Sequence, residues 1–317
     1  MKIVFMGTPD FSVGALEAII EAGHEVTAVV TQPDRPKGRS RQLQMPPVKE
    51  CALKHAIPVF QPAKLRVPEA VAQLREYPAD IYVVAAFGQI LSEEVLSIPK
   101  YGCINIHASL LPAYRGSAPI QRVIMDGLKQ TGITIMQMDK GIDTGDIIMQ
   151  EPVEIMDSDT GGSLFDRLSV TGAEMIVKVL REIEAGTAVR TRQDESRASY
   201  AGMLQKSEGL IKWERTSAET ERLIRALDPW PSAYTYLRGR MLKIWRSCIA
   251  GPGAASGRQV PGTVAGIDDD AIYVTTGDGC LRVTEVQLEG KKRMNVHDFL
   301  LGVKISTGEV LGSGTGG

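Results

Sequence analysis

The sequence predicts an α/β domain with a mostly parallel sheet, followed by a smaller domain built as a β-barrel. An apolar run at residues 2–6 ends at Gly7, apolar residues recur at helical spacing over 11–22, and a second apolar run covers 26–31. This β-α-β order implies two parallel strands joined by a right-handed crossover. Beyond residue 233, short strand patterns separated by Gly and Asp turns are typical of a small barrel.

The rest of the first domain continues the alternation of strands and helices. The run 79–86 is the most apolar strand pattern, so we expect it at the centre of the sheet, buried on both faces. Periodicity predicts further strands at 57–60, 102–107, 131–138 and 146–150, and helices at 47–56, 65–77, 92–97, 118–127 and 160–186. The last helix closes this domain, which we place at residues 1–189.

A polar stretch without sustained periodicity, residues 190–206, is predicted to be a linker to the second domain. Helix and strand patterns follow at 217–227, 233–237, 241–248, 262–267, 272–276 and 281–288. Five short strands suit a small barrel, which we place at residues 207–310. We expect residues 311–317, which are mostly glycine, to form a disordered tail.

The composition is that of an ordinary globular protein, with 43% hydrophobic and 23% charged residues. No run of about 18 apolar residues is present, so no membrane span is expected. The apolar part of the N-terminus is too short for a signal peptide, and we expect a cytoplasmic protein. Four cysteines and four histidines are scattered without a Cys-x-x-Cys pair, so neither a disulfide framework nor a metal site is predicted.

The formal net charge of −2 is unevenly distributed. Residues 1–189 carry 18 basic and 23 acidic side chains, a net of −5, whereas residues 190–317 carry 18 and 15, a net of +3. The first half nevertheless contains a loop rich in Pro, Gly and Arg at 32–46. A polyanionic partner would meet this loop and the second domain, and a solvated basic surface is the alternative.

The stretch from Tyr101 to Gln121 carries most of the candidate chemistry. Its strand alternates apolar residues with Asn105 and His107, which therefore share one face. An amide can hold a carbonyl oxygen that becomes negative, and an imidazole can hold or donate a proton near neutral pH. A strand edge with satisfied polar groups is the alternative interpretation.

Three loops can surround this strand. Residues 87–90 follow the predicted central strand at its carboxyl end, where open α/β sheets bind ligands. The turn at 109–112, S-L-L-P, offers two large apolar side chains that can line a pocket for a flat organic ligand. The third loop carries Asp139, Asp143 and Asp146, and its pattern alone does not select one of these acids.

Several motifs occur in one order along the whole chain. They are F-M-G-T-P-D-F at 5–11, T-Q-P-D-R-P-K-G-R at 31–39, I-N-I-H-A-S-L-L-P-A-Y-R-G at 104–116, T-I-M-Q-M-D at 134–139, G-I-D-T-G-D at 141–146 and D-P-W-P at 228–231. This set resembles the signature of the folate-dependent formyltransferases. The first turn of the chain does not match the G-x-G-x-x-G motif of dinucleotide-binding proteins.

The resemblance implies a Rossmann-like catalytic domain and an OB-like barrel, a fold often used on nucleic acids. The Asn, His and Asp shared by the family fall on Asn105, His107 and Asp143, which are the implied catalytic residues. The formyl donor is 10-formyltetrahydrofolate, acting as a co-substrate, and no metal takes part. The implied folate contacts are Ser109, Leu110, Leu111, Pro112, Phe87, Gly88 and Ile90.

Formyl transfer makes few chemical demands. A neutral amine attacks the formyl carbon, so Asn105 can donate to the resulting oxyanion and His107 can stabilise it or protonate the leaving folate nitrogen. Asp143 can orient the imidazole. Direct transfer needs no covalent intermediate, and Ser109 lacks the G-x-S-x-G surroundings of a hydrolase nucleophile.

Within the family, the motifs resemble the branch whose amine is the methionine of initiator Met-tRNA. A small amine has no use for four cations in one loop, namely Arg35, Lys37, Arg39 and Arg41. In the family an arginine of this loop is tied to tRNA recognition, and it aligns with Arg39. The barrel adds further cations at Arg238, Arg240, Lys243, Arg246, Lys291, Lys292 and Arg293.

Two alternatives stay open. A formyltransferase for a small amine, such as an amino-sugar nucleotide or glycinamide ribonucleotide, or a hydrolase of formyl-folate would share the same three residues. A non-catalytic α/β protein with an RNA-binding barrel would not need them. In the favoured case the partners are initiator Met-tRNA and a folate, with no membrane, and we expect a monomer.

Overall fold

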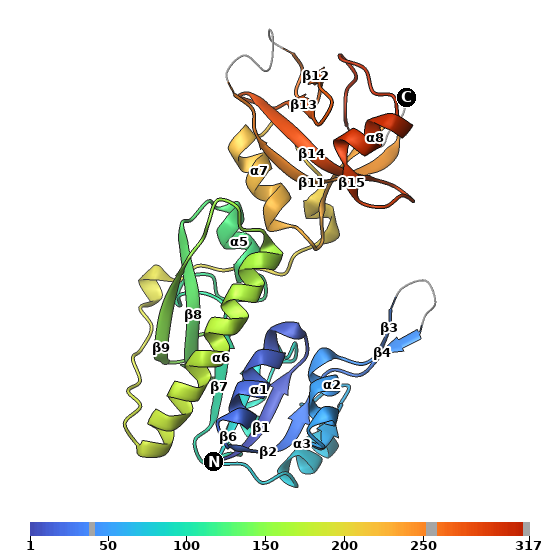
Figure 1. The fold of residues 1–317 in the computed structure, drawn as a ribbon. Coiled ribbons are helices and arrows are strands. Elements are labelled where there is room, and N and C mark those ends of the chain that lie inside the picture. Colours follow the sequence, from blue (N-terminus) through green and yellow to red (C-terminus); the bar gives the residue numbers. More distant parts are fainter. Residues whose placement is uncertain (38–41, 252–258, 313–317) are drawn as a thin grey trace. The chain divides into compact units, whose positions relative to one another are not determined.

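The computed structural model describes residues 1–37, 42–251 and 259–312. Contacts between residues divide the chain into two compact units, both traced in Figure 1. The first unit comprises Met1–Pro119, Gln130–Glu154 and Phe165–Gly202, and the second comprises Ile120–Lys129, Ile155–Leu164 and Met203–Gly317. The units therefore differ from the predicted domains, because two short segments of the first half of the chain cluster with the second unit.

The first unit contains a seven-stranded sheet in the order β5-β2-β1-β6-β7-β8-β9. Neighbours from β5 to β7 are parallel, whereas β8 is antiparallel to β7 and to β9. The mostly parallel sheet is confirmed, and β6 is its middle strand, with every residue buried. The strands are β1 Lys2–Gly7, β2 Glu25–Val30, β5 Val59–Phe60, β6 Ile81–Ala85, β7 Cys103–His107, β8 Gln130–Gln137 and β9 Ile147–Glu154.

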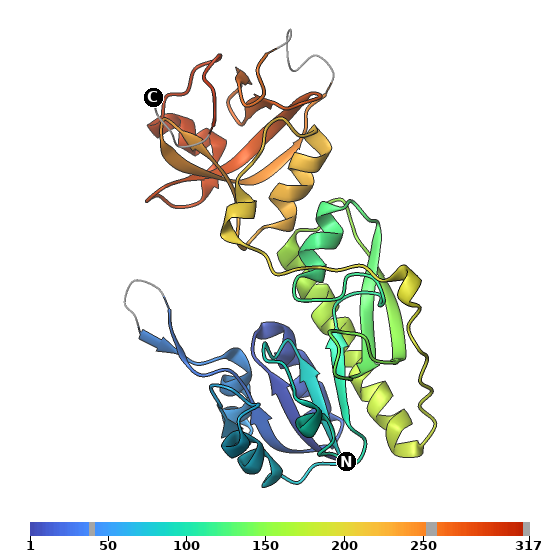
Figure 2. The same ribbon diagram turned by 180° about the vertical axis from the view of Figure 1, so that it is seen from behind.

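Helices cover both faces of this sheet. Figure 1 shows α1, α2 and α6 in front of the strands, and the reverse view in Figure 2 brings α3 and α4 forward. These helices are α1 Val13–Glu21, α2 Pro47–Lys54, α3 Pro68–Arg75, α4 Glu93–Leu96 and α6 Gly161–Ala185. None of the helices in the described part of the chain, α6 included, is long and apolar enough to cross a membrane.

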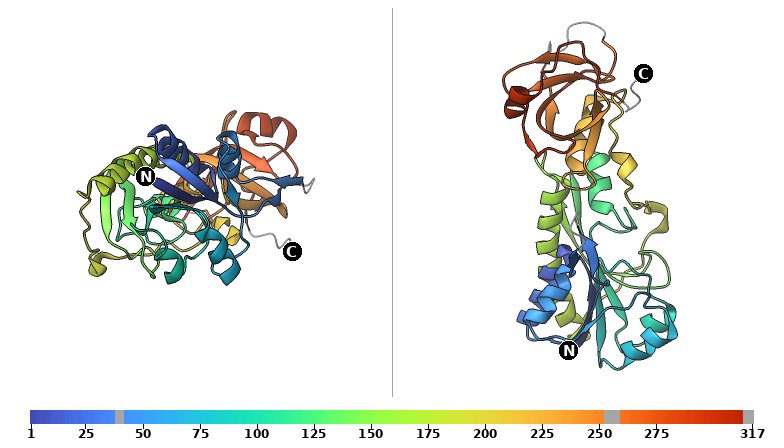
Figure 3. Two further views of the ribbon diagram at one scale, coloured as in Figure 1. Left: turned by 90° about the horizontal axis from the view of Figure 1, so that it is seen from below. Right: turned by 90° about the vertical axis from the view of Figure 1, so that its right-hand side faces the viewer.

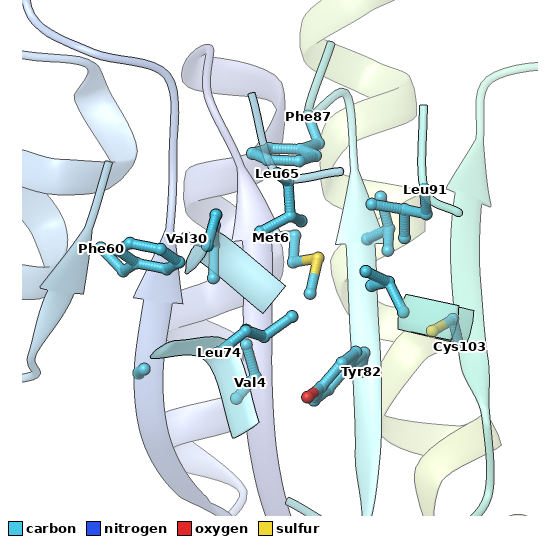
Figure 4. Packing of buried hydrophobic residues seen from close by; sticks show 14 of the residues in the cluster. Val4, Met6, Val30, Phe60, Leu65, Leu74, Tyr82, Phe87, Leu91 and Cys103 are labelled. Atoms are coloured by element: carbon cyan, nitrogen blue, oxygen red, sulfur yellow. The ribbon is translucent and has the colours of Figure 1, made fainter. Parts of the chain in front are cut away.

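A hydrophobic cluster lies on the α3 and α4 face of the sheet (Figure 4). Val4, Met6 and Tyr82 project into it from neighbouring strands, and Leu74 and Phe87 pack over them. Each fully buried side chain of this size contributes about 1.5–3 kcal/mol relative to an exposed one, so the cluster is a main source of stability. The Tyr82 hydroxyl has no hydrogen-bond partner among the described residues.

The basic loop predicted at 32–46 contains a two-stranded ribbon. Strand β3 (Arg35–Lys37) pairs antiparallel with β4 (Gln42–Gln44). Each strand is only three residues long, and the loop is rich in Pro and Arg. The sequence periodicity therefore could not predict the ribbon. Arg39 and Arg41 lie outside the described residues.

Residues 190–202 belong to the first unit, whereas the sequence predicted a linker over 190–206. Thr191 and Ile147 exchange two backbone hydrogen bonds of 2.8 Å. Farther along, the Arg115 amide donates to the Ser199 carbonyl at 2.8 Å, and the Ala201 amide donates to the Arg115 carbonyl at 2.7 Å. The segment is attached largely through its backbone, so its side chains show no periodicity that a sequence analysis could detect.

The second unit contains an antiparallel sheet in the order β10-β11-β14-β13-β12, with β15 paired to β14. Its strands curve around a common interior, as Figure 3 shows, which matches the predicted barrel. The strands are β10 Ala233–Leu237, β11 Arg240–Ile249, β12 Val264–Ile267, β13 Ile272–Thr275, β14 Cys280–Leu288 and β15 Met294–Asn295. The helices are α5 Pro119–Met125, α7 Ser217–Ala226 and α8 Val296–Gly302, of which α8 was not predicted.

The chain after α8 joins the two edges of this sheet. Val310 bridges Thr263, beside β12, and Gly312 bridges Tyr236 in β10. Leu311 lies between them and is only 3% exposed. The predicted disordered tail is therefore wrong at Leu311 and Gly312, because one buried leucine and its backbone bonds complete the barrel. Residues 313–317 lie outside the described part of the chain.

Candidate active site

Strand β7 presents Asn105 and His107 on one face. Ile106, between them, points to the opposite face, where a Cβ on Gly172 of α6 would lie 2.9 Å from its side chain. The predicted alternation is therefore present, with the apolar residues directed at the helix layer. His107 is 6% exposed, and the Asn105 amide has no hydrogen-bond partner within the described residues.

The imidazole of His107 lies between two loops. Its Nε2 atom is 3.1 Å from the Tyr114 carbonyl oxygen, and because a carbonyl only accepts, this nitrogen carries the hydrogen in that contact. Its Nδ1 atom is 3.6 Å from the Asp143 carboxylate, beyond the length of a hydrogen bond. A proton taken up at Nδ1 would face that carboxylate.

In the loop between β8 and β9, Asp139 and Asp143 have different partners, a distinction that the sequence pattern did not provide. The Asp139 carboxylate accepts hydrogen bonds from the Gly141 amide at 3.0 Å and the Thr144 hydroxyl at 2.6 Å, so it shapes the turn. Asp143 instead directs its carboxylate to His107 and accepts from the Gly116 amide at 2.8 Å. Its φ of +54° is left-handed, a conformation that Asp adopts more readily than most residues with a side chain.

The apolar turn at 109–112 is firmly anchored. The Ser109 carbonyl accepts from the Thr134 hydroxyl at 2.6 Å, and the Leu111 amide donates to the same hydroxyl at 3.1 Å. The Ser109 hydroxyl donates a hydrogen bond to the Ala113 carbonyl at 2.6 Å, within the same turn. Ser109 and Leu111 are buried, whereas Leu110 and Pro112 stay partly exposed. The turn is thus a rigid support whose accessible apolar groups are Leu110 and Pro112.

The other proposed folate contacts, after strand β6, differ in accessibility. Phe87 is 2% exposed and belongs to the hydrophobic cluster, and its carbonyl accepts from Thr8 at 3.0 Å and Gln32 at 3.2 Å. Gly88 is exposed with a φ of +79°, and Ile90 is 77% exposed. Gly88 and Ile90 are therefore open to a ligand, while the Phe87 ring supports the loop from within the core.

A family model described as formyl transferase matches residues 1–180, and the model of its C-terminal domain matches residues 203–304. The chain belongs to the formyl transferase family. The methionyl-tRNA formyltransferase of Agathobacter rectalis is 52% identical over 308 residues, covering 97% of this chain and 98% of that protein. That of Bacillus subtilis is 50% identical over 313 residues, covering 98% of each chain. The resemblance found in the motifs is confirmed.

Solved structures show the same fold. A sugar 3N-formyl transferase, WlaRD, crystallised with dTDP and 5-N-formyl-THF, superposes with a TM-score of 0.66 over 92% of this chain and 99% of that chain. The two sequences are only 22% identical, so this comparison concerns the fold alone. It supports the combination of a Rossmann-like unit with a barrel.

Arg115 belongs to the motif at 104–116, and the sequence predicted no role for its side chain. Arg115 is fully buried, and its guanidinium binds Glu195 at 2.7 and 2.9 Å and Gln193 at 2.8 and 3.2 Å. The hydrogen bonds from Arg115 hold the pKa of Glu195 below its ordinary value. Gln193 and Glu195 lie in the segment predicted as a linker, and no sequence signal pointed to either residue.

One cation of the basic ribbon, Arg35, can be assessed in the structure. Asp34, the acid nearest to its cations in sequence, is bound instead by the Lys49 ammonium at 2.7 Å and the Gln61 amide at 2.7 Å. Arg35 is exposed and contacts only Gln32, at 3.4 Å, in the described part of the loop. The structure therefore leaves Arg35 free of carboxylates there, and it describes no side chain for Lys37, Arg39 or Arg41.

Several barrel cations are engaged within the fold. Arg238 pairs with Glu309, and Arg246 and Arg293 pair with Glu285. These three arginines are therefore less available to a polyanion than the other barrel cations named from the sequence. The cations without an ion pair to a described residue are Arg240, Lys243, Lys291 and Lys292.

In the described part of the chain, the fold brings together a group of metal-ligating residue types that is dispersed in the sequence. Donor atoms of Glu17, Cys51 and His55 lie within 4.8 Å of one another. Burial and the Glu17 carboxylate raise the pKa of the Cys51 thiol to about 11. Because metals bind the thiolate, this environment disfavours the ligand form of Cys51.

Proposed function

We propose that the chain transfers the formyl group of 10-formyltetrahydrofolate to the α-amino group of methionine on initiator Met-tRNA, for translation initiation. The convergence of Asn105, His107 and Asp143 at the end of β7 carries this proposal on the chemical side. The choice of substrate rests on the full-length similarity to methionyl-tRNA formyltransferases at about 50% identity.

The three side chains suit direct attack of an amine on a formyl carbon. The Asn105 amide has an unused donor that can bind the developing oxyanion, worth on the order of 10²–10³ in rate. His107 can protonate the leaving folate nitrogen, and Asp143 compensates the charge that the imidazole gains. In this proposal Asp143 also helps to take the amine's proton through a water molecule.

The folate would lie against the accessible groups of two loops. Leu110 and Pro112 offer apolar surface on the anchored turn, and Gly88 and Ile90 offer exposed backbone and an apolar side chain after β6. Buried Ser109, Leu111 and Phe87 hold these loops in place. Bound folate analogue should therefore slow hydrogen exchange at 87–90 and 109–112, and protection confined to the second unit would contradict this placement.

The tRNA would be recognised through phosphate contacts. The ribbon cations Arg35, Lys37, Arg39 and Arg41 are the first group, and Arg240, Lys243, Lys291 and Lys292 of the barrel are the second. Phosphate contacts position a nucleic acid and make its affinity fall steeply with salt. We propose that the protein acts as a monomer, since one chain supplies all three catalytic groups. We further propose that it works in the cytoplasm and needs no metal.

One assay tests the proposal against its alternatives. The purified protein receives 10-formyltetrahydrofolate together with Met-tRNA, an amino-sugar nucleotide or glycinamide ribonucleotide, and kcat/KM is measured for each amine. We expect formylmethionyl-tRNA to dominate by orders of magnitude. Faster use of a small amine would identify a different formyltransferase, and release of formate without any acceptor would identify a hydrolase.

A further inference from the structure

Gln193 joins the two loops that flank His107. Its side chain is buried, 4% exposed, and its Nε2 atom donates to the carbonyl oxygens of Asp143 at 2.8 Å and Gly145 at 2.7 Å. Its Oε1 atom accepts from the Nε and Nη2 atoms of Arg115 at 3.2 and 2.8 Å. Both amide hydrogens and both oxygen lone pairs are therefore used.

The chemistry of the neighbours fixes the orientation of this amide. A guanidinium only donates and a backbone carbonyl only accepts, so the oxygen must face Arg115 and the nitrogen must face the 143–145 loop. A glutamate at position 193 would satisfy Arg115 equally well. Its second carboxylate oxygen, however, would lie against two carbonyl oxygens that it cannot bond.

Each loop held by Gln193 delivers a group to the site. On one side, Arg115 stands between Tyr114, whose carbonyl contacts the His107 Nε2 atom, and Gly116, whose amide binds the Asp143 carboxylate. On the other side is Asp143 itself, in the left-handed conformation with φ of +54°. Gln193 thus bonds the carbonyl of a residue that holds a left-handed backbone conformation.

The segment that carries Gln193, residues 191–195, is itself anchored on both sides of this residue. Glu195 binds Arg115 through both carboxylate oxygens, at 2.7 and 2.9 Å, and Thr191 is bridged to Ile147 by two backbone bonds. Gln193 lies between these two attachments, so it has little freedom to follow a displaced loop. A shift of either loop would separate Asp143 from His107.

We propose that Gln193 is a positioning residue for formyl transfer, holding Asp143 and the Tyr114 carbonyl in register with His107. This inference rests on the proposed function, because it assumes that Asp143 and His107 act on the formyl group. Gln193 touches neither imidazole nor carboxylate, so it acts through the loops. A displacement of about 1 Å in such a group can cost on the order of 10²-fold in rate.

The decisive variant is Gln193→Glu, which keeps the size of the side chain and the bond to Arg115. We expect kcat with Met-tRNA to fall on the order of 10²-fold, with KM for folate nearly unchanged in the folded variant. If Gln193 served only to accept hydrogen bonds from Arg115, this variant would stay fully active, and the inference would be overturned. Arg192→Gln, at the exposed neighbouring position, is the matched control and should behave as wild type.

A double-mutant cycle separates this inference from the proposed function. In an Asp143→Ala background the loop has no carboxylate left to position, so Gln193→Glu should add only a few-fold further loss. Full multiplication of the two effects would contradict the inference. If Asp143→Ala alone kept wild-type kcat, the catalytic assignment would fail; if Asp143→Ala were slow and Gln193→Glu normal, only the positioning role would fail.

A second variant covers the case in which Gln193→Glu folds poorly. Gln193→Met has a similar length and lacks both donor and acceptor, and hydrogen exchange can be followed in the full chain. We expect faster exchange at 139–146 and 114–116, with the strands of the sheet unaffected. Unchanged exchange in both loops would show that Gln193 does not hold them.

Discussion

Polar side chains are used in opposite ways at the end of β7 and in the barrel of the second unit. At the end of β7, the Asn105 amide has no partner among the described residues, and His107 and Asp143 stand 3.6 Å apart. In the barrel, Arg293 binds Glu285 at 2.6 Å and Asp228 at 3.1 Å, and its guanidinium lies 4.5 Å from the centre of the Trp245 ring.

The difference separates groups kept for a substrate from groups that hold the fold. A polar group near a ligand site is useful only while some of its bonding capacity stays unused, which costs stability. A charged group that has saturated its partners stabilises the protein but has nothing left to offer a ligand. The sequence does not show this difference, because it does not show which polar side chains find partners in the fold.

The largest effect is expected at His107 and Asn105. Replacing either by alanine removes an interaction made in the transition state and should lower kcat on the order of 10²–10³-fold. The unfolding free energy should change little, because neither side chain is saturated with partners. Single-turnover formyl transfer and urea titration of the same samples check this, and near-normal kcat in His107→Ala would refute the assignment.

The next effect concerns the basic ribbon. Changing Arg39 and Arg41 to alanine should raise KM for Met-tRNA about tenfold or more. The slope of log affinity for tRNA against log salt concentration should become shallower by about one unit for each phosphate contact that the variant removes. Folate affinity should be unaffected. Kinetics at two salt concentrations measure this, with Arg66→Ala, an exposed cation elsewhere in the first unit, as the control.

A third prediction concerns Arg293 in the barrel. Arg293→Met should lower the unfolding free energy by about 2 kcal/mol, between the values for exposed and buried ion pairs, because it leaves Asp228 without its cation and Glu285 with Arg246 alone. Formyl transfer measured well below the melting temperature should keep its kcat. A stable variant with impaired chemistry would place Arg293 among the functional groups instead.

The ion pair also predicts a pH dependence. Hydrogen bonds from Arg293 lower the pKa of Glu285, so its contribution to stability is complete above the unfolded value of about 4.3 and is lost as the pH falls through the folded value. The stability gap between wild type and Arg293→Met should thus be full at pH 7 and shrink below about pH 4. A gap that is constant down to pH 3 would exclude this linkage.

The smallest effect is expected at Tyr82. Its buried hydroxyl lacks a partner among the described residues and yet lies in the hydrophobic cluster, remote from any chemistry proposed for this chain (Figure 4). Tyr82→Phe should therefore leave kcat unchanged and stabilise the protein by up to about 1 kcal/mol. A clear loss of stability would reveal a hydrogen bond of this hydroxyl in solution.

How much of the molecule could be predicted from sequence follows from how each part is held. Strand β7 and the face shared by Asn105 and His107 were predictable, because burial of Ile104 and Ile106 imposes a period of two. Asp143 could not be separated from Asp139 by pattern, since the choice depends on which acid caps the turn.

Other parts left no pattern to detect. Gln193 acts through hydrogen bonds to a distant loop, and its neighbours are attached through their backbones, so residues 190–202 resemble a linker. Leu311 and Gly312 complete the barrel with one buried side chain in a glycine-rich tail. In both places, contacts between residues far apart in the chain override the local composition.

The most direct test measures kcat for Met-tRNA formylation and the unfolding free energy side by side in two variants, His107→Ala and Arg293→Met. We expect opposite results in the two variants. His107→Ala loses on the order of 10²–10³ in kcat and keeps its stability, whereas Arg293→Met keeps its kcat and loses about 2 kcal/mol of stability. Parallel losses of rate and stability in both variants would contradict the account.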